Sequence, residues 1–216
     1  MNLLILAANG QIARIVEDRI LNEEDFADVH LTLGLRGSER LDALKGNPRV
    51  TLAEVDLENR AAVEKSMKDQ EMVFVDTVDH DQDNAKTRNV IAAMKSNHVD
   101  RVIFANVAGI YDEVPGAFGR WNKEMVGKGL PTAAGSDRLL RESGLTYTTL
   151  RLCWLTYRDE IRYSTKTSKE PFEGVSGSRK SVADLVLRIV KDPDLGAKES
   201  LGIADPTTQG ADRPVY

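Results

Sequence analysis

The feature that most constrains this chain is a regular alternation between short apolar runs and stretches with helical periodicity. The first apolar run is Asn2–Ala8, and Ile12, Val16 and Ile20 behind it fall on one face of a helix. Further strand-like runs follow at Val29–Arg36, Arg49–Val55, Glu71–Asp76, Arg101–Val107 and Tyr147–Leu152. Helical stretches lie between them at Ser38–Lys45, Glu58–Lys68, Asp83–Asn97 and Thr132–Ser143. Such repeated strand–helix units predict right-handed crossovers and a parallel sheet with helices on both faces.

The last helix has the clearest periodicity in the sequence. From Val182 to Val190, apolar residues recur at positions i, i+3, i+4, i+7 and i+8. Ser181 and Asp184 resemble a capping box at the start of this helix, and Pro193 is expected to stop it.

The length of 216 residues favours a single domain, 1–216. A barrel of eight such units needs about 250 residues, so we expect a doubly wound, Rossmann-type α/β fold with three layers. The least periodic segments, Asp112–Pro131 and Arg158–Ser178, each follow the carboxyl end of a predicted strand. We expect them to form loops or short helices that frame a pocket, as small substrate-side elements towards the C-terminus. The polar tail Thr207–Tyr216 is expected to add little to the core.

Composition excludes several classes of function. The 29 basic and 34 acidic residues give a net charge of −5, which disfavours nucleic acid as a partner. Cys153 is the single cysteine and the three histidines are scattered, so we expect no metal site. Asp79, Asp81 and Asp83 lack the glycine and distal glutamate of a calcium loop, so we interpret them as acids at a helix start. No apolar run is long enough for a membrane span, and no signal peptide is evident, so we predict a cytoplasmic protein.

The turn after the first strand contains the small residues that a dinucleotide site needs. Gly10 stands between Ala7 and Ala13, and small residues here permit a tight turn and a close approach of the pyrophosphate. The helix that follows offers free N–H groups and the positive end of its dipole to the phosphates. An ordinary tight turn of a parallel sheet is the alternative interpretation. The cofactor contacts that we predict in this turn are Ala8, Asn9, Gly10, Gln11 and Ile12.

This turn resembles the Gly-Ala-Thr-Gly-x-x-Gly turn of atypical short-chain dehydrogenase/reductases, in their NmrA-like, NAD(P)H-binding branch. Three further segments resemble that family in the same order along the chain: Asp56-Leu57, Ser143–Arg151 and Ser178–Asp184. The resemblance extends over about residues 2–205. It implies a Rossmann-type protein that binds NAD(P)H, with Asp56 and Leu57 facing the adenine.

The end of the second strand indicates which cofactor is preferred. NAD-specific sites usually place an acid there, whereas an arginine suits the 2′-phosphate of NADP. Arg36 ends this strand, Ser38 follows, and no acid occurs before Glu39. We therefore predict that NADP(H) is preferred and that NAD(H) is possible; a solvated charge is the alternative for Arg36. Asp76 and Thr77, after the fourth strand, are expected to approach the middle of the cofactor.

The catalytic pair typical of the resembled family is absent. Those enzymes usually place a lysine four residues after a tyrosine, to lower the pKa of the proton-donating hydroxyl. None of the five tyrosines here has a lysine at that distance. Tyr111 and Asn106 are the remaining catalytic candidates, and Asn106 is also a candidate cofactor contact. The alternatives are that the Tyr111 ring packs beneath the following loop and that Asn106 satisfies its own backbone.

The apolar residues beyond the later strands predict where a small-molecule substrate binds. Phe118, Trp121 and Trp154 form an aromatic set there, with Cys153 interpreted as a small buried residue. We predict an NAD(P)H-dependent reductase of a quinone, a flavin or another small electron-accepting molecule, because such acceptors need little help from protein acids. The alternative is a regulatory protein that senses NADP(H) without turnover and acts through a protein partner.

Overall fold

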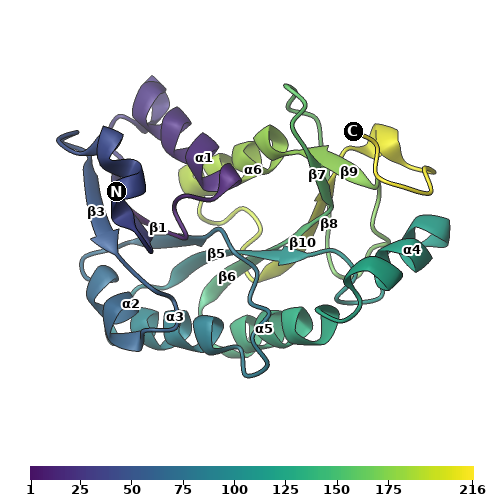
Figure 1. The fold of residues 1–216 in the computed structure, drawn as a ribbon, viewed down its shortest axis with the longest axis horizontal. Helices are drawn as coiled ribbons and strands as arrows, with labels where there is room; N and C mark the ends of the chain where they lie inside the picture. The colour runs from purple at the N-terminus through teal and green to yellow at the C-terminus, as the bar shows by residue number, and fades with distance from the viewer.

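One large sheet forms the centre of the molecule (Figure 1). The computed structural model describes residues 1–216. The strands of this sheet are β1 (Asn2–Leu6), β2 (His30–Leu35), β3 (Val50–Glu54), β4 (Met72–Val75), β5 (Arg101–Val107), β6 (Thr146–Leu152), β8 (Ser164–Lys166) and β10 (Glu199–Ala204). Their spatial order is β3-β2-β1-β4-β5-β6-β10-β8, and every neighbouring pair is parallel except β8 with β10. The order reverses between β1 and β4, which confirms the predicted doubly wound, Rossmann-type fold.

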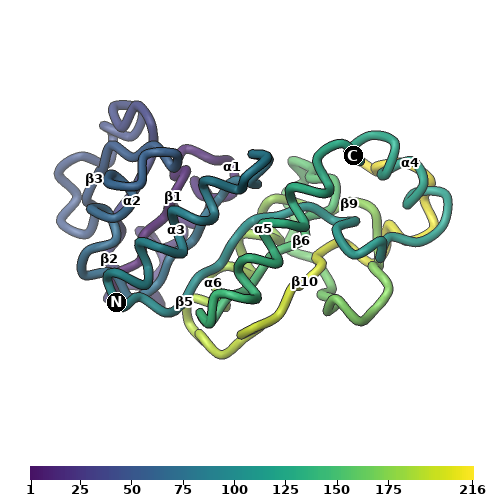
Figure 2. The backbone as a smooth tube through the Cα atoms, turned by 90° about the horizontal axis from the view of Figure 1, so that it is seen from below, coloured from purple at the N-terminus to yellow at the C-terminus, as the bar shows by residue number.

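Helices cover both faces of the sheet and complete the three predicted layers (Figures 1 and 2). One face carries α1 (Gln11–Asn22) and α6 (Arg179–Lys191), which pack against each other. The opposite face carries α2 (Arg60–Ser66), α3 (Ala85–Ser96) and α5 (Leu130–Glu142). Because both faces are covered, β1 from Leu3 to Leu6 and the whole of β4 are apolar and buried. No helix has the length and apolarity that crossing a membrane requires.

A smaller group of elements lies beyond the carboxyl ends of the later strands, near the C-terminus of the chain (Figure 1). It consists of α4 (Gly116–Val126) and a two-stranded parallel sheet of β7 (Trp154–Thr156) and β9 (Ser176–Ser178). These segments fall within or beside the two stretches that the sequence predicts as pocket-framing elements. Their position supports that expectation.

Several elements differ from the sequence prediction. Residues Ser38–Leu44 form a 3-10 helix, η2, instead of an α-helix. Strand β10 was not predicted, because Ser200 and Gly202 interrupt its apolar pattern. The predicted capping box is also wrong, because α6 begins three residues earlier: the Ser178 hydroxyl accepts the Ser181 N–H at 2.9 Å.

The C-terminal tail contributes more to the fold than expected. Thr208 is buried, and its Oγ1 accepts the Val175 N–H at 2.9 Å. Gln209 Oε1 accepts the Gly174 N–H. These bonds hold the tail against the segment before β9, which places residues 209–212 at the wall of a pocket described below.

Candidate functional site: a dinucleotide cleft at the strand-order reversal

The turn between β1 and α1 has the geometry predicted for a phosphate-binding turn. Ala7 adopts a left-handed backbone with φ of +59°, and the Gly10 N–H donates to the Ala7 carbonyl at 2.9 Å. Gly10 is the N-cap of α1 and makes no side-chain cap. Ala8 and Ile12 are buried beneath the turn, whereas Asn9 and Gln11 are exposed. The turn therefore presents backbone and polar groups to the cleft between β1 and β4.

Asp76 occupies the helix start at this turn. It directly follows β4, and its Oδ2 accepts the Ala13 N–H at 2.8 Å. A Cβ atom at Gly10 would lie 2.0 Å from the same oxygen, so only glycine fits there. Burial raises the pKa of Asp76 to about 6, while hydrogen bonds from Ala13 and Ile12 and the charge of Arg179 act in the opposite direction.

A second carboxyl group lies close to this turn, and sequence reasoning missed it. Glu17, on α1, is 1% exposed, and neither of its carboxyl oxygens accepts a hydrogen bond. Arg14 Nε lies 4.0 Å from Glu17 Oε2. Burial raises the pKa of Glu17 to about 8, and the nearby Asp76 charge adds to the shift. Glu17 lies four residues after Ala13 and three before Ile20, so the helical period places it on the buried face of α1; this signal could have identified it.

The adenine side of the cleft brings four predicted cofactor residues together. The cavity on this side has a volume of about 160 Å³, and Arg36, Asp56, Leu57 and Thr77 line it. It is smaller than the pocket of about 270 Å³ beside Phe118 that is described below. The guanidinium of Arg36 is exposed. Lys86, which the sequence did not indicate, also lines this cavity and pairs with Asp81 at 3.1 Å. The arrangement provides apolar contact for a base and a cation for a phosphate.

The other predicted contacts on this side differ from expectation. Ser38 does not line the cavity, and its N–H donates to Glu54.

Asp79 is buried near the start of α3, where its Oδ2 accepts the Thr87 N–H at 2.8 Å. This contact confirms the interpretation of Asp79 as an acid at a helix start. No group of three or more acidic, histidine or cysteine side chains is arranged to hold a metal ion.

The predicted aromatic set assembles on the opposite side of the cleft. The Trp121 and Trp154 ring centroids are 4.9 Å apart, and Phe118 lies 5.9 Å from Trp121. Trp154 Nε1 donates to Asn122 Oδ1 at 2.9 Å, which fixes the indole. Arg213 of the C-terminal tail lies over Trp121, 5.2 Å from the ring centroid.

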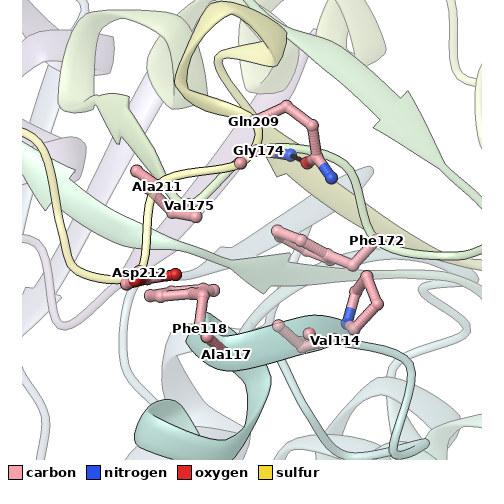
Figure 3. Close-up of a pocket in the computed structure, with 12 residues that line it drawn as sticks. Val114, Ala117, Phe118, Phe172, Gly174, Val175, Gln209, Ala211 and Asp212 are labelled. Carbon is pink, nitrogen blue, oxygen red and sulfur yellow. Dashed lines mark hydrogen bonds between the residues drawn. The ribbon is translucent and has the colours of Figure 1, made fainter.

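An apolar pocket of about 270 Å³ adjoins this aromatic set (Figure 3). Phe118 from α4 forms one wall, and Phe172 and Val175 form another. Gln209 and Asp212 of the tail add polar groups to the rim. The sequence indicated Phe118 by name, and Phe172 and Val175 lie in Arg158–Ser178, one of the two segments expected to frame a pocket; the contribution of the tail was not predicted.

The structure gives no support to the predicted catalytic roles of Asn106 and Tyr111. Asn106 is fully buried; its amide donates to the Ala133 carbonyl and accepts the Val107 N–H. The Tyr111 hydroxyl donates to Asp137 Oδ2 at 2.5 Å. Burial and the Asp137 carboxylate raise the Tyr111 pKa well above its usual range, so this phenol is a poor acid. Both side chains bind α5: Asn106 also satisfies the adjacent backbone, as its alternative interpretation anticipates, whereas the Tyr111 contact with Asp137 was not anticipated.

The side chain of Tyr157 contacts Gln11 of the phosphate-binding turn, and Arg179 lies against the Tyr157 ring. Gln11 Nε2 donates to the Tyr157 hydroxyl at 2.7 Å, and Arg179 Cζ lies 4.2 Å from the Tyr157 ring centroid. Arg179 is the first residue of α6, and its Nη1 is buried without a hydrogen-bond partner.

Cys153 is buried as predicted, and burial raises its pKa to about 12, so the thiol is unreactive.

A doubly wound sheet with a glycine turn and an adenine-side cavity at the reversal defines a dinucleotide-binding protein of the Rossmann class. Comparison with protein families matches residues 7–193 to the family described as NAD(P)H-binding. The chain belongs to this family. No curated protein matches the sequence.

Solved structures agree with this assignment. A short-chain dehydrogenase/reductase from Veillonella parvula, determined in complex with NADP, has 26% identity and a TM-score of 0.90, over 100% of this chain and 99% of that one. A Rossmann-fold NAD(P)-binding family protein from Shigella flexneri has 31% identity and a TM-score of 0.82, over 100% and 98%. ChuY, an anaerobillin reductase from Escherichia coli O157:H7, has 16% identity and a TM-score of 0.77, over 98% and 100%, and shares the fold.

Proposed function

We propose that the protein is an NADPH-preferring reductase of small, flat electron acceptors. The observation that carries the proposal is the position of Arg36, an exposed guanidinium on the wall of the cavity that Asp56 and Leu57 also line. A guanidinium there favours the 2′-phosphate of NADPH over the free hydroxyl of NADH. The complex of the Veillonella parvula relative with NADP supports this preference.

Different residues of the cleft would contact different parts of the cofactor. The turn at Gly10 and the N-terminal N–H groups of α1 would hold the pyrophosphate, and Arg36 the ribose phosphate. The nicotinamide would then point towards Trp154 and Trp121. A bound nicotinamide supplies a hydride, and the protein supplies its orientation and a dry surface.

The type of substrate follows from the missing proton donor. The Tyr111 hydroxyl keeps its proton and donates it in a hydrogen bond to Asp137. The Cys153 thiol is buried, and its pKa is raised. Hydride transfer to a quinone or a flavin leaves a delocalised anion, which water can protonate, whereas hydride transfer to an aldehyde would leave a strongly basic alkoxide that needs a positioned acid. The apolar pocket beside Phe118 and Phe172 suits a flat ring system.

The experiment is NADPH consumption by the purified protein with a panel of quinones, flavins and aldehydes. We expect turnover with the quinones or flavins and none with simple aldehydes, which need a protein acid. A Trp154→Phe variant should lose most of the tryptophan fluorescence change that NADPH causes in the parent protein. Turnover of aldehydes alone, or an unchanged fluorescence response in the variant, contradicts the placement of the substrate.

A second candidate function follows from the same commitment of Tyr111 and Asn106 to structural bonds. A protein with an intact cofactor cleft and no acid suits an NADP(H)-sensing regulator that acts through a protein partner. Tight NADPH binding together with a flat activity panel would favour this function over the reductase.

A further inference from the structure

A glutamate fills a backbone anion site beside the ribose end of the cleft. Gly37 adopts a left-handed backbone with φ of +69°, which turns the chain sharply after β2. The N–H groups of Gly37 and Ser38 then converge on Glu54: the first donates to Oε1 and the second to Oε2, each at 2.9 Å. A carboxylate is therefore held by both oxygens one residue away from Arg36.

The sheet register fixes Glu54 in this position. Glu54 is the last residue of β3 and lies opposite Leu35, the last residue of β2. Each strand therefore ends at the same level, and the Glu54 carboxylate lies against the backbone of the two residues after Arg36, beside the cavity that Arg36 lines but not on its wall. The two backbone hydrogen bonds lower the pKa of Glu54, so the group is ionised at neutral pH.

The nearby cations do not neutralise this carboxylate. None of the ion pairs in the structure involves Arg36 or Arg40. Glu39 contributes a further negative charge on the same turn, and its Oε1 would lie 2.9 Å from a Cβ at Gly37. The corner thus contains two free guanidinium groups, which attract a phosphate, and a fixed carboxylate, which repels it.

We propose that Glu54 is a specificity-determining residue that limits the preference for NADPH by occupying the two backbone N–H groups and opposing the 2′-phosphate. This inference rests on the proposed function, in which the cavity at Arg36 receives the ribose end of the cofactor. The free 2′-hydroxyl of NADH carries no charge, so Glu54 does not repel it, and both Glu54 oxygens already accept backbone N–H groups. Arg36 and Glu54 therefore act in opposite directions on the same group.

The test compares NADPH and NADH affinity in three variants by calorimetric titration. Glu54→Gln keeps the shape and one acceptor oxygen but removes the charge, whereas Glu54→Asp keeps the charge on a shorter side chain. Glu142→Gln removes an exposed acid at the end of α5 and serves as the matched control. Thermal unfolding of each variant identifies any that fail to fold.

We expect Glu54→Gln to raise the NADPH affinity roughly five- to twentyfold, with NADH affinity changed by less than about twofold. Glu54→Asp should keep a selectivity near that of the parent, and so should Glu142→Gln. An equal change for both cofactors, or weaker NADPH binding by a folded Glu54→Gln variant, overturns the role of Glu54 while leaving cofactor binding intact. Absence of binding of both cofactors by the parent protein overturns the proposed function, and this inference with it.

Discussion

Asp76 Oδ2 accepts the backbone N–H of Ala13 at 2.8 Å, so a carboxylate lies at the start of α1, where a dinucleotide places its pyrophosphate. The same oxygen lies above Gly10, at the reversal of strand order between β1 and β4. Two anions cannot share this position without a cost, unless Asp76 moves or takes up a proton. This contact therefore links cofactor binding to the ionisation of Asp76.

Cofactor binding should weaken as the pH rises through the pKa of Asp76, about 6. Below that pH Asp76 is neutral and does not repel the pyrophosphate; above it the ionised group does. Binding of NADH, which lacks the 2′-phosphate that would itself titrate near pH 6, should be roughly three- to tenfold tighter at about pH 5.5 than at about pH 7.5. Calorimetry at both pH values measures this. Asp76→Asn should bind with little dependence on pH, and a parent protein with the same affinity at both values would rule out the linkage.

Gly10→Ala should destabilise the protein by roughly 1–3 kcal/mol, because the new Cβ would lie 2.0 Å from Asp76 Oδ2. The backbone of Gly10, with φ of −63° and ψ of 155°, is open to alanine, so the clash with Asp76 is the main obstacle, with a lesser contact of 3.2 Å to the Ala7 carbonyl. Chemical denaturation of the single variants and of Gly10→Ala with Asp76→Ala forms a double-mutant cycle. The cost of Gly10→Ala should largely disappear in the Asp76→Ala background. A cost that persists there would assign it to the backbone instead.

Glu17 should make the stability of the protein fall as the pH rises. Its pKa is about 8 in the folded protein, against an ordinary value of 4.5 for an unperturbed glutamate side chain. The folded state therefore binds the proton more tightly, and this contribution is complete below about pH 4.5 and is lost as the pH rises through about 8. Glu17→Gln cannot ionise, so its stability relative to the parent should improve by at least about 2 kcal/mol between pH 5 and 9. Parallel curves of melting temperature against pH for the two proteins would contradict the assignment.

The alternating apolar runs were sufficient to predict the sheet and its helices, because strands covered on both faces must be apolar throughout. Short elements such as β7 and β9 contain three residues each and show no period, so they were missed. In the site, the turn at Gly10 and the cation Arg36 were predictable, since each is defined by its distance from a strand end. The contact of Arg151 with Glu113 joins residues 38 positions apart, and no local pattern encodes it.

Glu113 should be essential for the loop that leads to the apolar pocket. Its buried carboxylate accepts hydrogen bonds from Arg151 Nη1 at 2.5 Å, from the Gly109 N–H at 3.0 Å and from the Tyr111 N–H at 2.9 Å. Glu113→Ala leaves the Arg151 charge buried without its partner, which costs roughly 3–5 kcal/mol of unfolding free energy.

The matched control is an exposed ion pair between Asp112, on the same loop, and Lys123, on α4. Lys123 and Asp112 form an exposed ion pair, with side chains 67% and 84% exposed, so Lys123→Ala should cost less than about 1 kcal/mol. Urea unfolding of both variants makes the comparison. Equal losses in the two would show that Glu113 does not anchor the loop.

The most direct test of the account is the titration of the parent protein and of Arg36→Ala with NADPH and with NADH. Arg36 lines the adenine-side cavity, and its guanidinium is the group that we expect to contact the 2′-phosphate. The parent should bind NADPH more tightly than NADH, and Arg36→Ala should weaken NADPH binding by roughly 1–3 kcal/mol with little change for NADH. Absence of saturable binding of either cofactor at about 1 mM, which corresponds to about −4 kcal/mol, would contradict the account as a whole.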